Sequence, residues 1–245
     1  MTQHTWSDDQ VATMSLIGFG SFIFLSILWV AMSINGNAES IELSEIGSDP
    51  KFLLGSAIVS LISFGGTVWK LGIIGHPLGW RAVGFRPTTL KWMSITAAIG
   101  TLFVPVSVVI SLVVSNLLIH ENSVDNSLSL PVEQFDTVPI FEYIVVFISI
   151  AIIVPIAEEI FFRGVLFKWL RTRTSFWVAA GISSIIFGAI HFSAASMVSL
   201  SLAGFLCALS YEHSKSLWTA IAIHAGNNGI IVIVYYFVFK TPIIL

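Results

Sequence analysis

The chain has 245 residues, of which 56% are hydrophobic and only 10% are charged. Soluble domains usually carry about a quarter charged residues, so this composition argues against a soluble fold and indicates a protein dissolved in a lipid bilayer. The formal net charge of −3 provides no broad basic surface to neutralise phosphates, and we therefore expect no nucleic-acid partner.

Apolar stretches long enough to cross a hydrocarbon core of ~30 Å, roughly twenty residues each, recur along the chain. The predicted spans, in chain order, are 12–34, 52–71, 93–119, 140–166, 175–193, 195–211 and 216–239. The sequence thus predicts an all-α fold, a polytopic transmembrane bundle of about seven helices with a possible range of six to eight. Residues 1–139 would supply N-terminal spans and loops, and 140–240 a catalytic helix bundle within one integrated membrane domain.

Polar, acidic loops separate the earlier spans, at Asn35–Pro50 and His120–Pro139, and neither suggests a second folded domain. No Lys or Arg precedes the first apolar run, which therefore lacks the basic start of a signal peptide and is expected to be a retained helix. The segment His76–Trp92 mixes Pro, Gly, Arg and Trp and is expected either to rest on the cytoplasmic membrane surface or to be a plain connector.

The distribution of basic residues predicts the orientation, because cytoplasmic loops retain Lys and Arg during insertion. A cytoplasmic N-terminus would leave only Lys51 and Lys240 outside. It would place the following residues inside: Lys70, Arg81, Arg86, Lys91, Lys168, Arg171, Arg173 and Lys215. We predict a multi-pass protein of a cell membrane, of the prokaryotic inner or plasma membrane type, with its N-terminus in the cytoplasm.

The fourth span contains three ionisable residues, Glu158, Glu159 and Arg163, shortly after Pro155. Three unpaired charges at the centre of a span would cost on the order of 8 to 10 kcal/mol, so they must be paired or hydrated. Glu159 and Arg163 stand at i and i+4 and can form an ion pair, whereas Glu158 lies about 100° around the helix and is the freer carboxylate. Glu158 is then a candidate general base, although a purely structural ion-pair cluster remains an alternative.

Two further polar pairs lie on later spans. Phe187 and His191 are four residues apart, as are His224 and Asn228, so each pair faces one side of its helix. A base, a second proton carrier and hydrogen-bond donors for an oxyanion suffice for hydrolysis by an activated water. Asn227 is expected to point elsewhere, and the other histidines, His4, His76, His120 and His213, are interpreted as surface residues.

These residues resemble the CPBP family of intramembrane proteases, also called the CAAX protease and bacteriocin-processing or Abi family, which includes the type II CAAX prenyl endopeptidases. The family pattern is EExxxR, FxxxH and HxxxN or HxxxD on three different transmembrane helices, and all three motifs are intact in this order. The resemblance covers roughly residues 140–235.

The resemblance implies an intramembrane endopeptidase that acts on membrane-associated, prenylated or leader-type peptides. It implies that Glu158 activates water with help from His191, and that His224 and Asn228 stabilise the oxyanion. Glu159 and Arg163 would hold Glu158 in place.

No cofactor is required on this mechanism, but a divalent metal is the alternative. Glu158, His191 and His224 could bind zinc with one open position, yet the HExxH pattern is absent and a metal would occupy the proposed base.

Straight helices would place His191 ~24 Å and His224 ~12 Å above the cytoplasmic ends of their spans. The oligomeric state is not predicted.

Two other classes of function remain open at this point. A non-catalytic membrane scaffold could retain the polar cluster for helix packing, and a transporter could use buried ionisable residues as a pathway. The scaffold is disfavoured by four intact residues: Glu158, His191, His224 and Asn228. The lack of an inverted repeat argues against the transporter.

Overall fold

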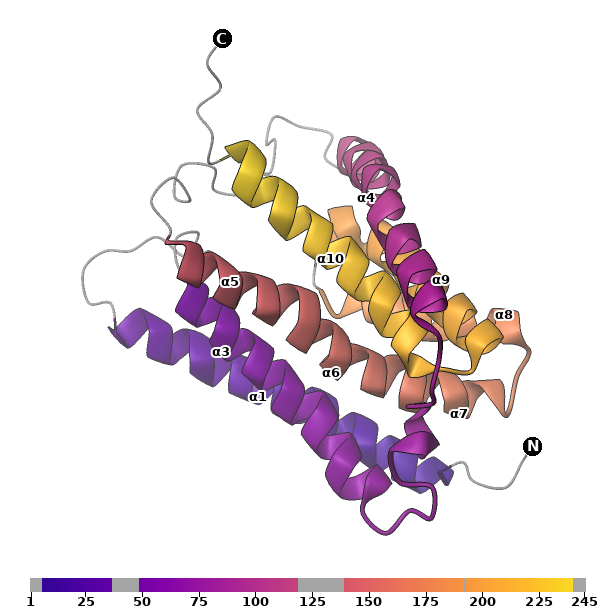
Figure 1. Cartoon of the computed structure of the whole chain (residues 1–245). Coiled ribbons are helices and arrows are strands. Elements are labelled where there is room, and N and C mark those ends of the chain that lie inside the picture. Colours follow the sequence, from indigo (N-terminus) through magenta and orange to yellow (C-terminus); the bar gives the residue numbers. More distant parts are fainter. Residues whose placement is uncertain (1–5, 37–48, 119–138, 192, 240–245) are drawn as a thin grey trace.

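The computed structural model describes residues 6–36, 49–118, 139–191 and 193–239. The central parts of both predicted polar loops, together with His4, His120 and Lys240, lie outside these ranges. The described residues are almost entirely helical and contain no strand (Figure 1). The predicted all-α class is therefore confirmed.

Nine α-helices and several tighter or wider helical turns make up the described part of the chain. The α-helices are α1 (Asp8–Gly36), α3 (Pro50–Ser60), α4 (Leu90–Leu118), α5 (Ile140–Ile148), α6 (Val154–Phe161), α7 (Lys168–Arg171), α8 (Phe176–Ala189), α9 (Ala194–Ser214) and α10 (Leu217–Phe239). The π-helical turns are η1 (Leu61–Gly66), η2 (Trp69–Ile73), η6 (Ser149–Ile153) and η7 (Phe162–Phe167), and η3 (Gly79–Val83) is a 3-10 helix.

Five helical segments among the described residues are long and apolar enough to cross a membrane. One of them, Ile140–Arg171, joins α5, α6 and α7 through the π turns η6 and η7. The predicted spans at 175–193 and 195–211 correspond to α8 and α9. With 14 residues, α8 extends only about 21 Å, which is shorter than the hydrocarbon core. The polytopic bundle is confirmed, with α8 as its shortest predicted span.

The C-terminal helices pack closely around α10, which lies along α4 (Figure 1). A Cβ atom at Gly226 would lie 2.2 Å from the backbone oxygen of Ala97, so the glycine is needed for the approach of the two helices. Thr101 Oγ1 also donates a hydrogen bond of 3.2 Å to the Gly226 carbonyl. Small residues thus let the backbones of α4 and α10 touch, as is common between membrane helices.

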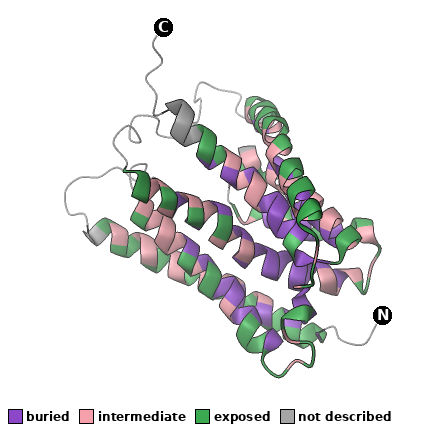
Figure 2. Ribbon diagram, viewed as in Figure 1, coloured by how far each residue is buried: buried purple, intermediate pink, exposed green. Residues whose placement is uncertain are grey.

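Aromatic side chains fill the core between α1, η1 and the end of α6. The Phe19 and Phe161 rings lie 5.1 Å apart edge to face, and Phe64 packs 5.2 Å from Phe161. Buried residues concentrate on the inner helices, whereas α1 and α4 present many exposed apolar side chains (Figure 2). Such an apolar exterior suits contact with lipid tails.

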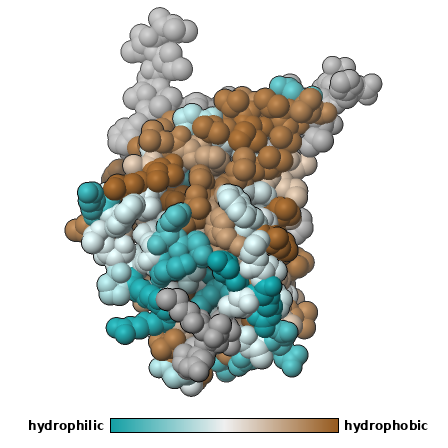
Figure 3. Space-filling model, turned by 90° about the vertical axis from the view of Figure 1, so that its right-hand side faces the viewer, coloured by the Kyte–Doolittle hydropathy of each residue, from teal (hydrophilic) through white to brown (hydrophobic). Residues whose placement is uncertain are grey.

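On the face that Figure 3 shows, hydrophilic residues gather toward one end of the molecule. There, Arg171 and Lys215 share Glu212, and Arg173 pairs with Asp8. These contacts place several residues of the predicted cytoplasmic set together. The side of the membrane on which this end lies remains a prediction from the sequence.

Labelling of introduced cysteines tests the orientation. Native Cys207 is buried and provides an unreactive background. We expect Lys215→Cys to react with a membrane-impermeant maleimide only after the cells are opened, and Ile140→Cys, at the far end of the bundle, to react in intact cells. The reverse pattern would show that the N-terminus is outside.

Candidate active site

The helix that carries the two glutamates is interrupted on both sides by π turns. The turn η6 leads into α6, where Pro155 occupies the first turn, and η7 follows directly after Phe161. Single π turns inside helices are frequent at functional sites because they shift side chains and free backbone groups. Here they bracket the segment that holds Glu158 and Glu159.

Glu159 and Arg163 form a fully buried ion pair. Arg163 Nη1 donates to Glu159 Oε1 at 3.0 Å, and neither side chain is exposed. The predicted i, i+4 pair is therefore confirmed. Arg163 Nη2 donates a second hydrogen bond, of 2.7 Å, to the backbone oxygen of Gly204 on α9. Its guanidinium also lies 4.8 Å from the centre of the Phe187 ring, so one side chain links η7, α8 and α9.

Gly204 has a specific role in this contact, which the sequence did not reveal. A Cβ atom at this position would lie 2.7 Å from Arg163 Nη2 and 3.2 Å from the Phe187 ring. A larger residue would therefore push the guanidinium away from the carbonyl that it binds.

His224 of α10 lies between the two glutamates. Its Nδ1 is 3.0 Å from Glu159 Oε1 and its Nε2 is 3.8 Å from Glu158 Oε2. Because a carboxylate can only accept a hydrogen bond, Nδ1 must carry the proton of the contact with Glu159. The other ring nitrogen, Nε2, then faces Glu158. The carboxylate of Glu158 is buried and accepts no hydrogen bond from the described residues. It is thus the glutamate that the protein leaves free.

Asn228 lies one turn after His224, and its amide Nδ2 donates to the backbone oxygen of Ile150 at 3.1 Å. Its Oδ1 accepts from Asn227 Nδ2 at 3.2 Å. The expectation that Asn227 points elsewhere is wrong, because Asn227 lines the same small cavity as His224 and Asn228. Consecutive positions on a helix differ by about 100°, but a cavity beside α10 reaches both.

This small cavity has a volume of about 20 Å³ and lies among α4, α8, α9 and α10. That volume is enough for about one water molecule. Polar groups of His224, Asn227 and Asn228 line one side, and Phe187 lines another. Glu158 does not line the cavity itself but faces the His224 ring that does.

His191 occupies a more exposed position at the end of α8. Its Nδ1 lies 2.8 Å from the Phe187 carbonyl oxygen, and no hydrogen bond joins it to either glutamate. The Phe187 ring contacts both histidine rings, with centroid distances of 5.1 Å to His191 and 5.6 Å to His224. The described contacts therefore bring His224, rather than His191, to Glu158, and the different heights predicted for the two histidines are consistent with this separation.

The donor geometry does not fit the zinc site that was considered as an alternative. Glu159 Oε1 is already bound to Arg163 and His224, and the Phe187 ring packs against both His191 and His224. Within the described ranges no three His, Cys, Asp or Glu side chains converge as a metal-ligand set. Glu158, His191 and His224 are thus not brought together around one point, and we derive no step through a metal.

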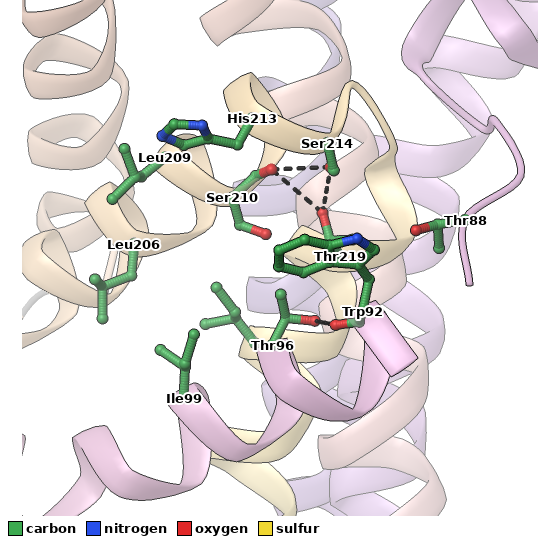
Figure 4. Close-up of a pocket in the computed structure, with 11 residues that line it drawn as sticks. Thr88, Trp92, Thr96, Ile99, Leu206, Leu209, Ser210, His213, Ser214 and Thr219 are labelled. Atoms are coloured by element: carbon green, nitrogen blue, oxygen red, sulfur yellow. Dashed lines mark hydrogen bonds between the residues drawn. The ribbon is translucent and has the colours of Figure 1, made fainter. Parts of the chain in front are cut away.

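A larger cavity of about 590 Å³ lies between α4, α9 and α10, toward the polar end of the bundle (Figure 4). Leu206, Leu209 and Ile99 form an apolar part of its wall, while Trp92 and His213 stand near hydroxyl-bearing residues. Ile223 lines both this cavity and the small one beside His224. A single side chain therefore lies at the boundary between a roomy, mostly apolar cavity and the polar site.

The fold and the buried polar cluster define a polytopic membrane protein, and comparisons with known proteins find similarity to membrane peptidases. Residues 140–230 match the family model described as "Type II CAAX prenyl endopeptidase Rce1-like". The chain is also 37% identical over 83 residues to a Bacillus subtilis (strain 168) protein named "Putative membrane peptidase YdiL". That alignment spans 34% of this chain and 34% of the relative. No solved structure shows significant similarity.

These matches confirm the resemblance to the CPBP, or CAAX protease, family. The matched residues include Glu158, Glu159, Arg163, His191, His224 and Asn228.

The ion pair should dominate the stability of this region. Removing one partner of a buried pair leaves the other charge unpaired and typically costs about 3 to 5 kcal/mol. We therefore expect Arg163→Met to be strongly destabilised in unfolding experiments on the purified protein in detergent. Glu159→Gln combined with Arg163→Met should recover much of the loss, because it removes both charges.

Arg171→Met is the matched control, since its pair with Glu212 is partly exposed and should be worth about 0 to 1 kcal/mol. Equal stability of Arg163→Met and the wild-type protein would show that the buried pair has no such role.

Proposed function

We propose that the chain is an intramembrane endopeptidase that hydrolyses peptide bonds with a water molecule activated by Glu158. The observation that carries this proposal is the unequal environment of the two adjacent glutamates. Glu159 is neutralised by Arg163, whereas the Glu158 carboxylate accepts no hydrogen bond from the described part of the chain and faces His224 Nε2. Two neighbouring carboxyl groups in different environments are a common arrangement of groups with different roles in hydrolytic sites. The family match supports the same class of activity.

In the proposed reaction, Glu158 takes a proton from water as the oxygen attacks the carbonyl carbon of the scissile bond. A positioned base of this kind contributes about 10²- to 10⁴-fold to the rate. His224, whose ring is fixed by its bond to Glu159, lies within reach to share that proton. The proton is then delivered to the leaving nitrogen as the C–N bond breaks, which completes the hydrolysis.

The oxyanion that forms on the former carbonyl requires hydrogen-bond donors. Asn227 and Asn228 present amide groups beside His224 in the small cavity, and we assign this task to them. His191 lies near the exposed end of α8 and packs against Phe187. We propose that its ring faces the bound substrate. The helper of Glu158 is therefore His224 in this proposal, in place of the His191 role that the family resemblance implies.

The substrate is proposed to be a peptide segment held at the membrane. The 590 Å³ cavity offers apolar walls next to the polar site, which suits an apolar or lipid-modified segment better than a charged one. Prenylated, leader-type and other membrane-associated peptides all meet this description. No metal is required by these steps.

Mass-spectrometric comparison of peptide termini in membranes tests the activity. Membranes that carry the wild-type protein should contain new termini that are absent when Glu158→Gln is expressed at the same level, because the amide cannot accept the proton. Glu142→Gln is the matched control, since Glu142 lies on α5 within the same long helix and away from the site. Identical termini for wild type and Glu158→Gln, with both proteins folded, would favour a non-catalytic membrane scaffold.

A further inference from the structure

The segment between η2 and α4 carries two arginines whose side chains make no hydrogen bond or ion pair with any described residue. Arg81 and Arg86 are exposed and line an open, shallow cleft of about 370 Å³ together with Leu78 and Pro87. Four other basic residues at this end of the bundle already have partners: Lys168 with the Ala82 carbonyl, Arg171 and Lys215 with Glu212, and Arg173 with Asp8. Lys70 and Lys91 are exposed on the flanking helical segments and do not line the cleft.

The backbone beneath these two arginines is held from several directions. Leu217 N donates to the Gly84 carbonyl and Ser216 Oγ donates to the Arg86 carbonyl, both at 2.7 Å. Tyr211 Oη donates to the Val83 carbonyl at 3.4 Å. The chain turns at Gly84, where φ is 101°, a conformation that favours glycine. Both guanidinium groups therefore project from a fixed frame that is attached to the α9–α10 turn.

The surroundings of the cleft place it at a membrane surface. Leu78 and Trp80 are 37% and 41% exposed, and Trp69 and Trp92, at the ends of neighbouring spans, are more than half exposed. Tryptophan is enriched at the level of lipid headgroups. A ligand in this cleft would thus have an apolar part beside Leu78 and Pro87 and an anionic part at the arginines.

We propose that Arg81 and Arg86 form a binding site for the phosphate group of an anionic phospholipid. A guanidinium presents paired N–H donors that match phosphate oxygens. The two unpaired positive charges are complementary to a lipid with net negative charge, whereas the choline of a zwitterionic lipid would oppose them. Exposed apolar neighbours favour a lipid over a soluble phosphate. Because Thr88 and Trp92 line the 590 Å³ cavity, the bound lipid would lie beside the proposed substrate cavity.

Native mass spectrometry of the full chain in detergent, titrated with phosphatidylglycerol, phosphatidylcholine or inorganic phosphate, tests this site. Juxtamembrane basic residues contribute about fivefold each to anionic-lipid binding, so we expect phosphatidylglycerol to bind about 25-fold more tightly than phosphatidylcholine. Arg81→Gln alone should lose about fivefold, and Arg81→Gln with Arg86→Gln should remove the preference.

The matched control is Lys70→Gln with Lys91→Gln, which removes the same charge from exposed positions on the flanking helical segments and should keep the preference. An unchanged thermal midpoint of the arginine variant would show that it is folded, as expected for side chains without partners. Equal binding of the two lipids to the wild-type protein, or an equal loss in the lysine control, would overturn the site. Inorganic phosphate that binds as tightly as phosphatidylglycerol would overturn its assignment to a lipid.

Discussion

The buried ion pair between Glu159 and Arg163 is the contact on which the rest of the site depends. An arginine with no exposed surface must satisfy its charge and its donors inside the protein. Arg163 meets this need with Glu159, with the Gly204 carbonyl and with the face of Phe187, although its Nε has no hydrogen-bond partner among the described residues. The pair therefore fixes η7 against α8 and α9, and Glu159 in turn fixes His224 of α10. Four parts of the chain meet through one guanidinium and one carboxylate.

This arrangement separates structural and chemical roles between adjacent residues. Glu159 accepts two hydrogen bonds through one oxygen. The Glu158 carboxylate has no donor among the described residues and faces the second nitrogen of the same histidine. Both glutamates are buried on α6, which has a π turn on either side. The proposed lipid site lies at the other end of the same framework, since the α9–α10 turn holds the Arg81–Arg86 segment in place.

Much of this could be predicted from the sequence, because burial in a bilayer makes polar residues conspicuous. The helical class, the Glu159–Arg163 pair and the region of family resemblance follow from hydropathy and i, i+4 spacing. Spacing within one helix does not determine contacts between helices, so His191 was expected beside Glu158 and Asn227 away from the site. Gly204 matters because its backbone carbonyl accepts a hydrogen bond from Arg163. A pattern of side chains in the sequence does not predict such a backbone contact. The π turns likewise have no pattern that distinguishes them from ordinary helix.

The central claim is that Glu158 is the base and Glu159 its support, and the rates of two isosteric variants test it most directly. Once a cleaved peptide is known, Glu158→Gln and Glu159→Gln should be compared on that peptide with purified protein under single-turnover conditions. Loss of a general base should lower the rate by about 10²- to 10⁴-fold in Glu158→Gln, with a smaller loss in Glu159→Gln, which retains an acceptor for His224. A Glu158→Gln variant with nearly wild-type rate, beside an inactive but folded Glu159→Gln, would contradict the assignment.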